Sequence, residues 1–227
     1  MKFKSRNTRI KEYNEAYPKR IDDPSTALRE YFKSHKMNLE KAVKKAKEKL
    51  LLIQEEREFE SIHIVMYEYP MKTDRPRTFG GHTFSPNAAA NHKYFESAVH
   101  CVVKTMKKIT TPAEIEIEAY LEMPSMVPPD EVILFEAKVL NVLDYPDYDN
   151  IGKCYTDMLK DVLIIDDNIF WSGRVRKYYS VTPRVEITIR YLTKIESDYI
   201  YRKLKNRRSI REAIQTGQCE IKKIGEE

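Results

Sequence analysis

Four aspartates and one lysine between positions 147 and 167 have the types and spacing that a metal-dependent reaction requires. Asp147 and Asp149 lie two residues apart, Lys153 follows four residues after Asp149, and Asp166 and Asp167 come after a further helical stretch. Carboxylate oxygens are the ligands that Mg²⁺ prefers, with water and substrate phosphate in the remaining positions. A lysine can neutralise charge on a phosphate oxygen. The constellation therefore favours metal-assisted hydrolysis of a phosphodiester.

The residues after the first acidic pair have the spacing of an amphipathic helix, with Asp149 or Asn150 as its expected cap. The apolar positions that fall on one side are Ile151, Tyr155, Met158, Leu159 and Val162. Lys153 and Asp157 fall on another side. If Asp147 and Asp149 occupy an extended stretch, their side chains point to the same face. For either aspartate alone, a turn or a helix cap is the competing explanation.

The elements that must position these residues follow from hydrophobic periodicity. Ala113 to Met123 alternates apolar residues with glutamates, which is typical of a strand with one buried face. We expect an α/β (α+β) fold, a mixed β-sheet with packed helices. The other expected elements are a helical hairpin over 25–58, a strand over 62–67, a helix from Pro86 to about Lys108, a loop over 124–137, a short strand over 139–142, two antiparallel strands over 174–180 and 184–192, and a helix over 194–215.

Charge divides the chain into a basic beginning, an acidic middle and a basic end. Residues 1–60 carry a net charge of +5, residues 61–189 carry −4 and residues 190–227 carry +4. Basic ends fit a polyanionic partner, although solvated helix faces explain them equally well. We expect a basic helical extension over 1–60, a catalytic domain over 61–192 and a basic helical tail over 193–227.

Composition excludes several classes of protein. The sequence has no run of eighteen apolar residues that could span a membrane, and its first twenty residues lack the apolar core of a secretory signal. Its three cysteines are widely spaced, form no C-x-x-C pair and are odd in number. This pattern argues against a zinc site and a disulfide framework, so we expect a cytoplasmic protein.

Three blocks of the sequence resemble the RusA family of Holliday junction resolvases. The first is Asp147-x-Asp149-Asn150-x-x-Lys153 followed by Asp166-Asp167. The second is Lys72-Thr73-Asp74-Arg75-Pro76-Arg77 with the Gly80-Gly81 hairpin, and the third runs from Arg176 to Ile187. The resemblance covers residues 62–192, and it departs from some members at Pro146, where they place a basic residue.

The resemblance implies a homodimer that cleaves four-way DNA junctions by paired nicks, with Mg²⁺ as cofactor and Mn²⁺ as a substitute. By position, it implies Asp147, Asp149 and Asp167 as metal ligands and Lys153 as the catalytic lysine. Asp166 is the weaker candidate of its pair, and Asp157 is expected to be structural. A phage or prophage origin fits the same resemblance.

Basic side chains elsewhere are candidates for DNA binding. Arg75 and Arg77 flank Pro76, which restricts the local backbone, and Lys72 precedes them. Arg174 and Arg176 share one face of an expected strand that also carries Lys177. Ordinary surface charge is the alternative for both groups.

Two other functions remain open. The first is a Mg²⁺ endonuclease that acts on other branched DNA, such as flaps. The second is a DNA-binding protein that recruits a protein partner through the helices over 25–58.

Overall fold

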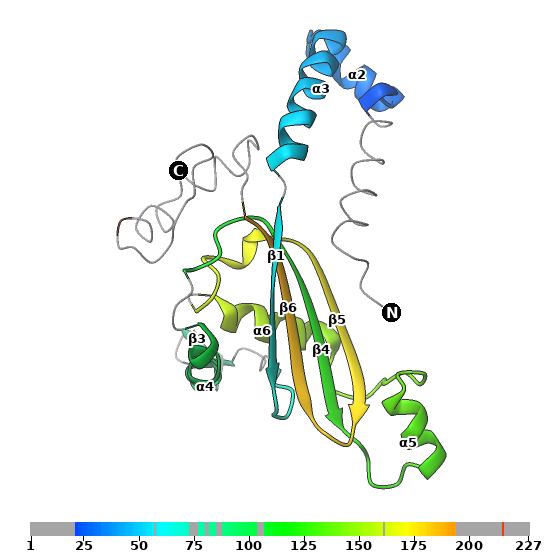
Figure 1. Cartoon of the computed structure of the whole chain (residues 1–227), viewed down its shortest axis with the longest axis vertical. Coiled ribbons are helices and arrows are strands. Elements are labelled where there is room, and N and C mark those ends of the chain that lie inside the picture. Colours follow the sequence, from blue (N-terminus) through cyan, green and yellow to red (C-terminus); the bar gives the residue numbers. More distant parts are fainter. Residues whose placement is uncertain are drawn as a thin grey trace. The chain divides into compact units, whose positions relative to one another are not determined.

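The alternating residues at 113–122 form β4 (Ala113–Glu122), which lies inside a four-stranded sheet. The computed structural model describes residues 21–56, 58–72, 77–79, 82–84, 88–103, 107–160, 162–193 and 215. The sheet has the order β1 (Phe59–Met66), β6 (Arg184–Leu192), β4, β5 (Phe170–Ser180), as Figure 1 shows. β4 pairs in parallel with β5 and antiparallel with β6. The expected class, a mixed sheet with packed helices, is confirmed.

The pairing corrects one expectation. We expected the last two strands to form an antiparallel pair, but β4 lies between β5 and β6. The two strands run in opposite directions, but each pairs with β4 and not with the other, and β6 also pairs with β1. β4 can accept two neighbours because its buried residues suit a central position.

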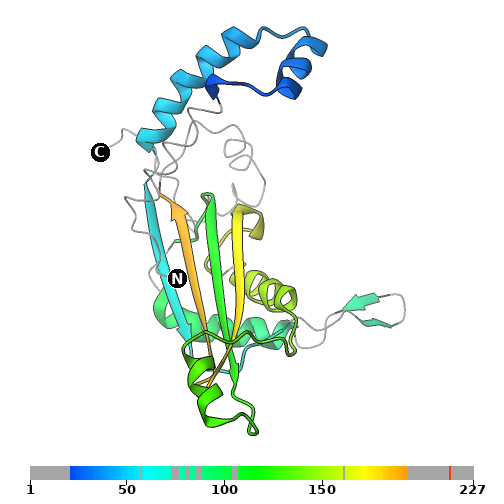
Figure 2. The same ribbon diagram turned by 90° about the vertical axis from the view of Figure 1, so that its right-hand side faces the viewer.

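Helix α6 (Tyr148–Leu159) packs on one face of β5, and Figure 2 shows the two elements side by side. The approach is close, because a Cβ added at Gly152 would lie only 2.9 Å from Cγ2 of Val175. Helix α4 (Ala88–Val103) contacts α6 through the ring of Phe95, whose centroid lies 6.4 Å from that of Tyr155. Both rings are fully buried. The core therefore lies between this face of the sheet and the two helices.

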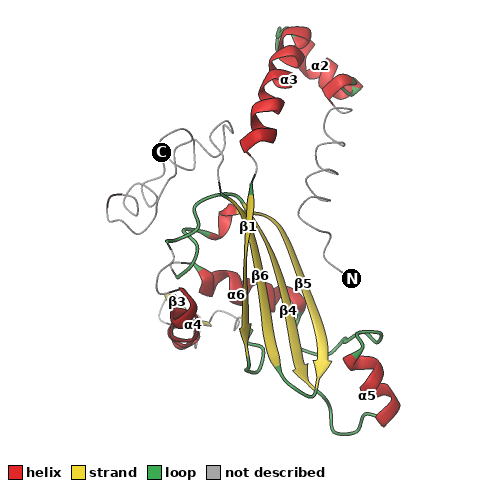
Figure 3. Ribbon diagram, viewed as in Figure 1, coloured by secondary structure: helices red, strands yellow, loops and turns green. Residues whose placement is uncertain are grey.

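Part of the expected loop over 124–137 is helical. α5 (Pro129–Glu136) begins with a proline at its first position and has Asp130 and Glu131 in its first turn. These are ordinary helix-start signals, which the proline content of the segment obscured. Figure 3 shows α5 beside the carboxyl ends of β4 and β5. The ring of Phe135 on α5 packs edge-on against that of Tyr179 on β5. The short strand expected over 139–142 is absent from this described segment.

The other face of the sheet carries charged and aromatic side chains. Lys138 donates a hydrogen bond of 2.9 Å to Glu118, and both contact Tyr120. Burial acts to raise the pKa of Glu118, but the bonds from Lys138, Tyr120 and Arg176 outweigh it and lower that pKa. Burial and the contact with Glu118 raise the pKa of Tyr120 to about 12, although Lys138 opposes the rise. The charges on this face are thus largely paired with one another.

Residues 21–59 belong to a different contact unit from residues 60–191. The first unit contains α2 (Thr26–Ser34) and α3 (Leu39–Glu56), so the expected helical hairpin is confirmed over its described residues. Ser25 caps α2, and the Asn38 side chain accepts a 2.8 Å hydrogen bond from the Lys41 amide at the start of α3. No helix among the described residues is long and apolar enough to cross a membrane.

The second unit also contains the short antiparallel pair β2 (Arg77–Phe79) and β3 (His82–Phe84), in agreement with the expected hairpin. Arg75 and nearly all of the helix expected over 194–215 lie outside the described residues.

Candidate active site

The first acidic pair lies at the amino-terminal end of α6. Asp147 is the N-cap residue, with φ −64° and ψ 143°, and Asp149 lies in the first helical turn. The helix thus begins before the expected cap at Asp149 or Asn150, and the two aspartates do not share one extended stretch. Both carboxylates are exposed, and Asn150 Nδ2 donates to Asp147 Oδ2 over 3.4 Å. The partial positive charge of a helix amino terminus favours anions at this position.

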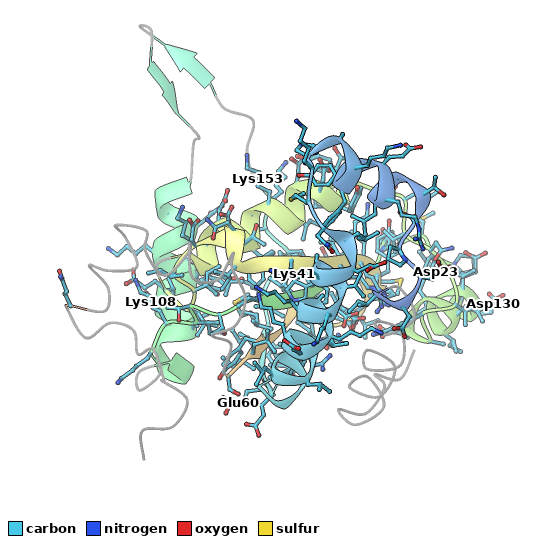
Figure 4. All side chains as sticks on the ribbon, turned by 90° about the horizontal axis from the view of Figure 1, so that it is seen from above. Asp23, Lys41, Glu60, Lys108, Asp130 and Lys153 are labelled. Carbon is cyan, nitrogen blue, oxygen red and sulfur yellow. The ribbon has the colours of Figure 1, made fainter. Side chains whose placement is uncertain are left out.

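Lys153 lies one turn further along α6 and is exposed. The helix buries Ile151, Cys154, Tyr155, Met158 and Leu159, so its expected apolar face is confirmed with Cys154 added. Val162 falls beyond the helix. Figure 4 shows Lys153 pointing from α6 away from the sheet. Because Asp149, Lys153 and Asp157 are spaced by four residues, they share one exposed side of the helix.

The second acidic pair precedes β5 at the short helix η1 (Asp167–Ile169). Asp166 accepts a 2.7 Å hydrogen bond from Asn168 and forms a 3.2 Å ion pair with Lys160. The hydrogen bond with Asp166 raises the pKa of Asp167, and burial adds to the rise. Burial acts to raise the pKa of Asp166, but the bonds with Asp167 and Lys160 prevail and lower it. The second acidic pair is therefore held together and is tied to Lys160.

These contacts place the second pair toward the carboxyl end of α6. Lys160, the partner of Asp166, is the C-cap residue of the helix, whereas Asp147 is its N-cap. A helix of twelve residues is about 18 Å long. Among the described residues, no group of three or more His, Cys, Asp or Glu side chains is placed to hold a metal ion. The donor chemistry fits a hard cation such as Mg²⁺, but one chain keeps its two acidic pairs apart.

Lys72 lies beside the loop that leads to Asp147. Its ammonium is 3.9 Å from the ring centroid of Tyr145 and also donates to the Tyr145 hydroxyl. The neighbouring amide of Met71 donates a 2.9 Å hydrogen bond to the hydroxyl of Tyr155 on α6. Arg77 lies in β2, and only its backbone is described. Lys72, whose side chain is the one described in this block, thus lies beside the loop that leads to the acidic end of α6.

Arg174 and Arg176 share a face of β5, as expected, but it is the face opposite to α6. Their neighbours in the register are Glu116 and Glu118 of β4. Arg176 forms ion pairs of 2.8 Å with Glu116 and 3.1 Å with Glu118, while Arg174 lies 3.8 Å from Glu116. Successive side chains of a strand alternate between faces, and Val175 packs against α6. Both arginines therefore point away from the side on which α6 lies.

Lys177 points to the α6 side, where its partners are backbone carbonyls. Its Nζ donates to the carbonyl oxygens of Asp144 at 2.5 Å and Pro146 at 3.1 Å. Tyr179, two residues further along β5, donates its hydroxyl proton to the Asp144 carboxylate. Burial and this bond raise the pKa of Tyr179 to about 12.

Sequence reasoning missed Tyr179 and Asp144. The only local signals were that Tyr179 shares a strand face with Lys177 and that Asp144 precedes Asp147 by three residues.

Two comparisons with known proteins bear on this region. A family model described as endodeoxyribonuclease RusA matches residues 68–190. The chain is also 30% identical over 135 residues to the uncharacterized protein YqaN of Bacillus subtilis (strain 168), a similarity that covers 57% of this chain and 95% of YqaN. The family match spans α6 and β5, and hence every acidic residue described above.

Proposed function

The chain belongs to the endodeoxyribonuclease RusA family, and on that premise we propose that it is a Mg²⁺-dependent, structure-selective nuclease. Its proposed reaction is the resolution of Holliday junctions by paired phosphodiester cleavage. The observation that carries the proposal is the exposed acidic end of α6, where Asp147 is the N-cap residue, Asp149 lies in the first turn and Lys153 follows Asp149 by about one turn. Two exposed carboxylates beside a lysine suit a cation and a phosphate together.

The proposed roles follow from the position of each side chain. Asp147 and Asp149 hold the cation. Asp167 lies toward the other end of α6 and serves as a further carboxylate where a second copy brings it to this cation; Asp166 is already engaged by Lys160 and Asn168. A bound Mg²⁺ or Mn²⁺ ion would supply Lewis-acid activation of the phosphoryl group and of the attacking water. Lys153 places a positive charge next to the scissile phosphate.

The separation of the two acidic pairs along α6 supports the proposal of a homodimer. One chain carries Asp147 and Asp149 at one end of the helix and Asp167 toward the other. A second copy supplies a second set of carboxylates, and two copies are also required to nick two strands of one junction. The proposed complex is therefore a dimer on a four-way junction.

Contacts with the DNA backbone are assigned to Lys72, Arg75 and Arg77. The position of Lys72 beside Tyr145 supports this assignment, because it places positive charge against a residue that precedes Asp147 by two positions. Arg174 and Arg176 stay predictions of the same kind, on the opposite face of the sheet.

The test is junction cleavage by Asp149→Asn, Asp167→Asn and Lys153→Met, with Asp130→Asn on α5 as the control. Each of the three changes is expected to reduce cleavage in Mg²⁺ by at least about 100-fold, as loss of a charge-stabilising group does. Asp130 is exposed and lies outside the proposed site, so its change should have no effect. Junction binding in EDTA should persist in both aspartate variants, since removing a carboxylate reduces repulsion of phosphate. Full cleavage by Asp149→Asn would contradict the proposal.

The substrate is tested separately. Cleavage of four-way junctions, flaps and linear duplexes by the wild-type protein should favour the junction. A preference for flaps would leave the nuclease assignment intact but replace the proposed substrate with another branched DNA.

A further inference from the structure

The loop that leads into α6 is fastened to β5 by two side chains. Lys177 and Tyr179 point to the α6 side of the sheet, and both contact residues 144–146. This loop ends at Asp147, the N-cap of α6. The position of that carboxylate therefore depends on how the loop is held.

The bond to Pro146 acts directly on Asp147. The carbonyl of Pro146 belongs to the peptide group that joins it to Asp147, and this group is planar. Lys177 Nζ binds that oxygen at 3.1 Å and the carbonyl of Asp144 at 2.5 Å. On the other side, the carbonyl of Asp147 accepts a 3.2 Å hydrogen bond from the Ile151 amide. Asp147 is thus held by the strand before it and by the helix after it.

Tyr179 adds a second fastening to the same loop. Its hydroxyl binds the Asp144 carboxylate, while its ring packs at 5.1 Å against Phe135. With Tyr179 bound to its carboxylate and Lys177 to its carbonyl, Asp144 is held through both groups. The loop thus has two independent attachments to one strand.

We propose that Lys177 is a positioning residue that sets Asp147 for cation binding, and not a contact to DNA phosphate. The inference rests on the proposed function, because it assigns Asp147 to the cation. Lysine suits the role because an ammonium carries three donors, so it can bind two carbonyls at once. Residues that orient a metal ligand commonly change metal affinity by about 10–100-fold when they are removed. Lys177 is partly buried, and its two carbonyl bonds direct its charge into the loop.

The experiment measures cation binding without DNA and DNA binding without cation. Mn²⁺ affinity is read by electron paramagnetic resonance for wild type, Lys177→Met, Tyr179→Phe and Asp147→Asn. Junction affinity is measured in EDTA at several salt concentrations, and the Mg²⁺ concentration for half-maximal cleavage is measured in parallel. Lys93→Met on α4 removes an exposed lysine far from this loop in sequence and is the matched control.

We expect Lys177→Met to weaken Mn²⁺ binding by about tenfold or more and to raise the Mg²⁺ requirement by a similar factor. Junction affinity in EDTA and its salt dependence should match those of Lys93→Met. Tyr179→Phe should shift Mn²⁺ binding in the same direction by a smaller factor, and it tests the loop even if Lys177→Met fails to fold. Unchanged Mn²⁺ affinity in both variants would overturn the inference. The inference would also be overturned if Lys177→Met lost junction affinity in EDTA and the dependence of log affinity on log salt concentration became shallower by about one, because that change marks a lost phosphate contact.

Asp147→Asn separates this inference from the proposed function. If Asp147→Asn weakens Mn²⁺ binding and Lys177→Met does not, only the positioning role fails. If Asp147→Asn leaves both Mn²⁺ binding and cleavage intact, the proposed function itself fails.

Discussion

At the scale of single residues, existing partners decide which charged side chains can serve a substrate. Lys153 is exposed at the acidic end of α6, whereas Lys177 binds two carbonyls and Arg176 pairs with two glutamates. All three are basic residues of the same matched region, yet they occupy different environments. Among the acidic residues, Glu118 is bound by several neighbours: Tyr120, Lys138 and Arg176 all donate hydrogen bonds to its carboxylate.

The first prediction concerns the pH dependence of stability and Glu118. Its pKa in the folded protein is lowered from the ordinary value of 4.5, so its contribution is present above that value and is lost as pH falls through the folded pKa. Glu118→Gln should lower the free energy of unfolding at pH 6 by about 1–3 kcal/mol, since Lys138 loses a charged acceptor. Between pH 6 and pH 3, the variant should lose less stability than wild type.

Urea denaturation at both pH values measures this difference, with Glu122→Gln as the control because Glu122 is exposed at the end of the same strand. The prediction would be contradicted if the free energy of unfolding fell by the same amount between pH 6 and pH 3 in wild type and in Glu118→Gln.

At the scale of secondary-structure elements, the close contact between α6 and β5 orients the candidate site. Gly152 lies on the side of α6 that meets Val175, and the absence of a side chain lets the helix approach the strand. The same face of β5 carries Lys177 and Tyr179, which hold the loop before the helix. Helix and loop are therefore positioned by one strand.

The second prediction is that Gly152→Val displaces α6 from β5. A Cβ at this position already lies 2.9 Å from Val175, so further bulk forces the two elements apart. Overpacking of this kind costs about 1–3 kcal/mol. Junction cleavage should fall as well, because the helix carries Asp149 and Lys153. Gly173→Ala is the matched control, since its Cβ would meet Ile115 at 3.4 Å and requires only a small adjustment. Wild-type stability and cleavage in Gly152→Val would show that this contact does not position the site.

At the scale of the whole molecule, the candidate chemistry belongs to one contact unit. All the described catalytic candidates lie within residues 60–191, whereas α2 and α3 belong to the other unit. The α2–α3 hairpin is basic and amphipathic, which suits a separate partner. The division of the chain into an extension over 1–60, a nuclease domain over 61–192 and a tail over 193–227 stays a prediction.

The third prediction is that a chain lacking residues 1–58 still cleaves four-way junctions. The shortened chain retains β1 from Phe59, so the sheet keeps its four strands. Cleavage rates should remain within about tenfold of wild type, with any loss arising from the missing positive charge. Gel-based cleavage assays at low and moderate salt measure this. Loss of activity at every salt concentration, in a chain that retains the wild-type circular dichroism of the sheet, would show that the extension takes part in catalysis.

The sequence alone was sufficient for the local features of the site. The apolar spacing predicted α6 and its buried face, and the same spacing placed Lys153 on the exposed side. Such predictions succeed because helical and strand periods are properties of neighbouring residues. The start of the helix was misplaced, since Asp147, Asp149 and Asn150 are all good caps and their order along the chain does not rank them.

Only the tertiary structure decided which distant residues meet. It placed β4 between β5 and β6, and it placed the Asp166–Asp167 pair near the carboxyl end of α6. It also showed that Lys177 donates hydrogen bonds to the carbonyls of a loop some thirty residues earlier in the sequence. Strand order and long-range hydrogen bonds depend on how the faces of sheets and helices pack together. The hydrophobic periodicity of one segment does not indicate which other segment it pairs with. The sequence determined which chemical groups this protein carries, and the packing of α6 on β5 decided which of them are exposed at the candidate site and which hold the structure.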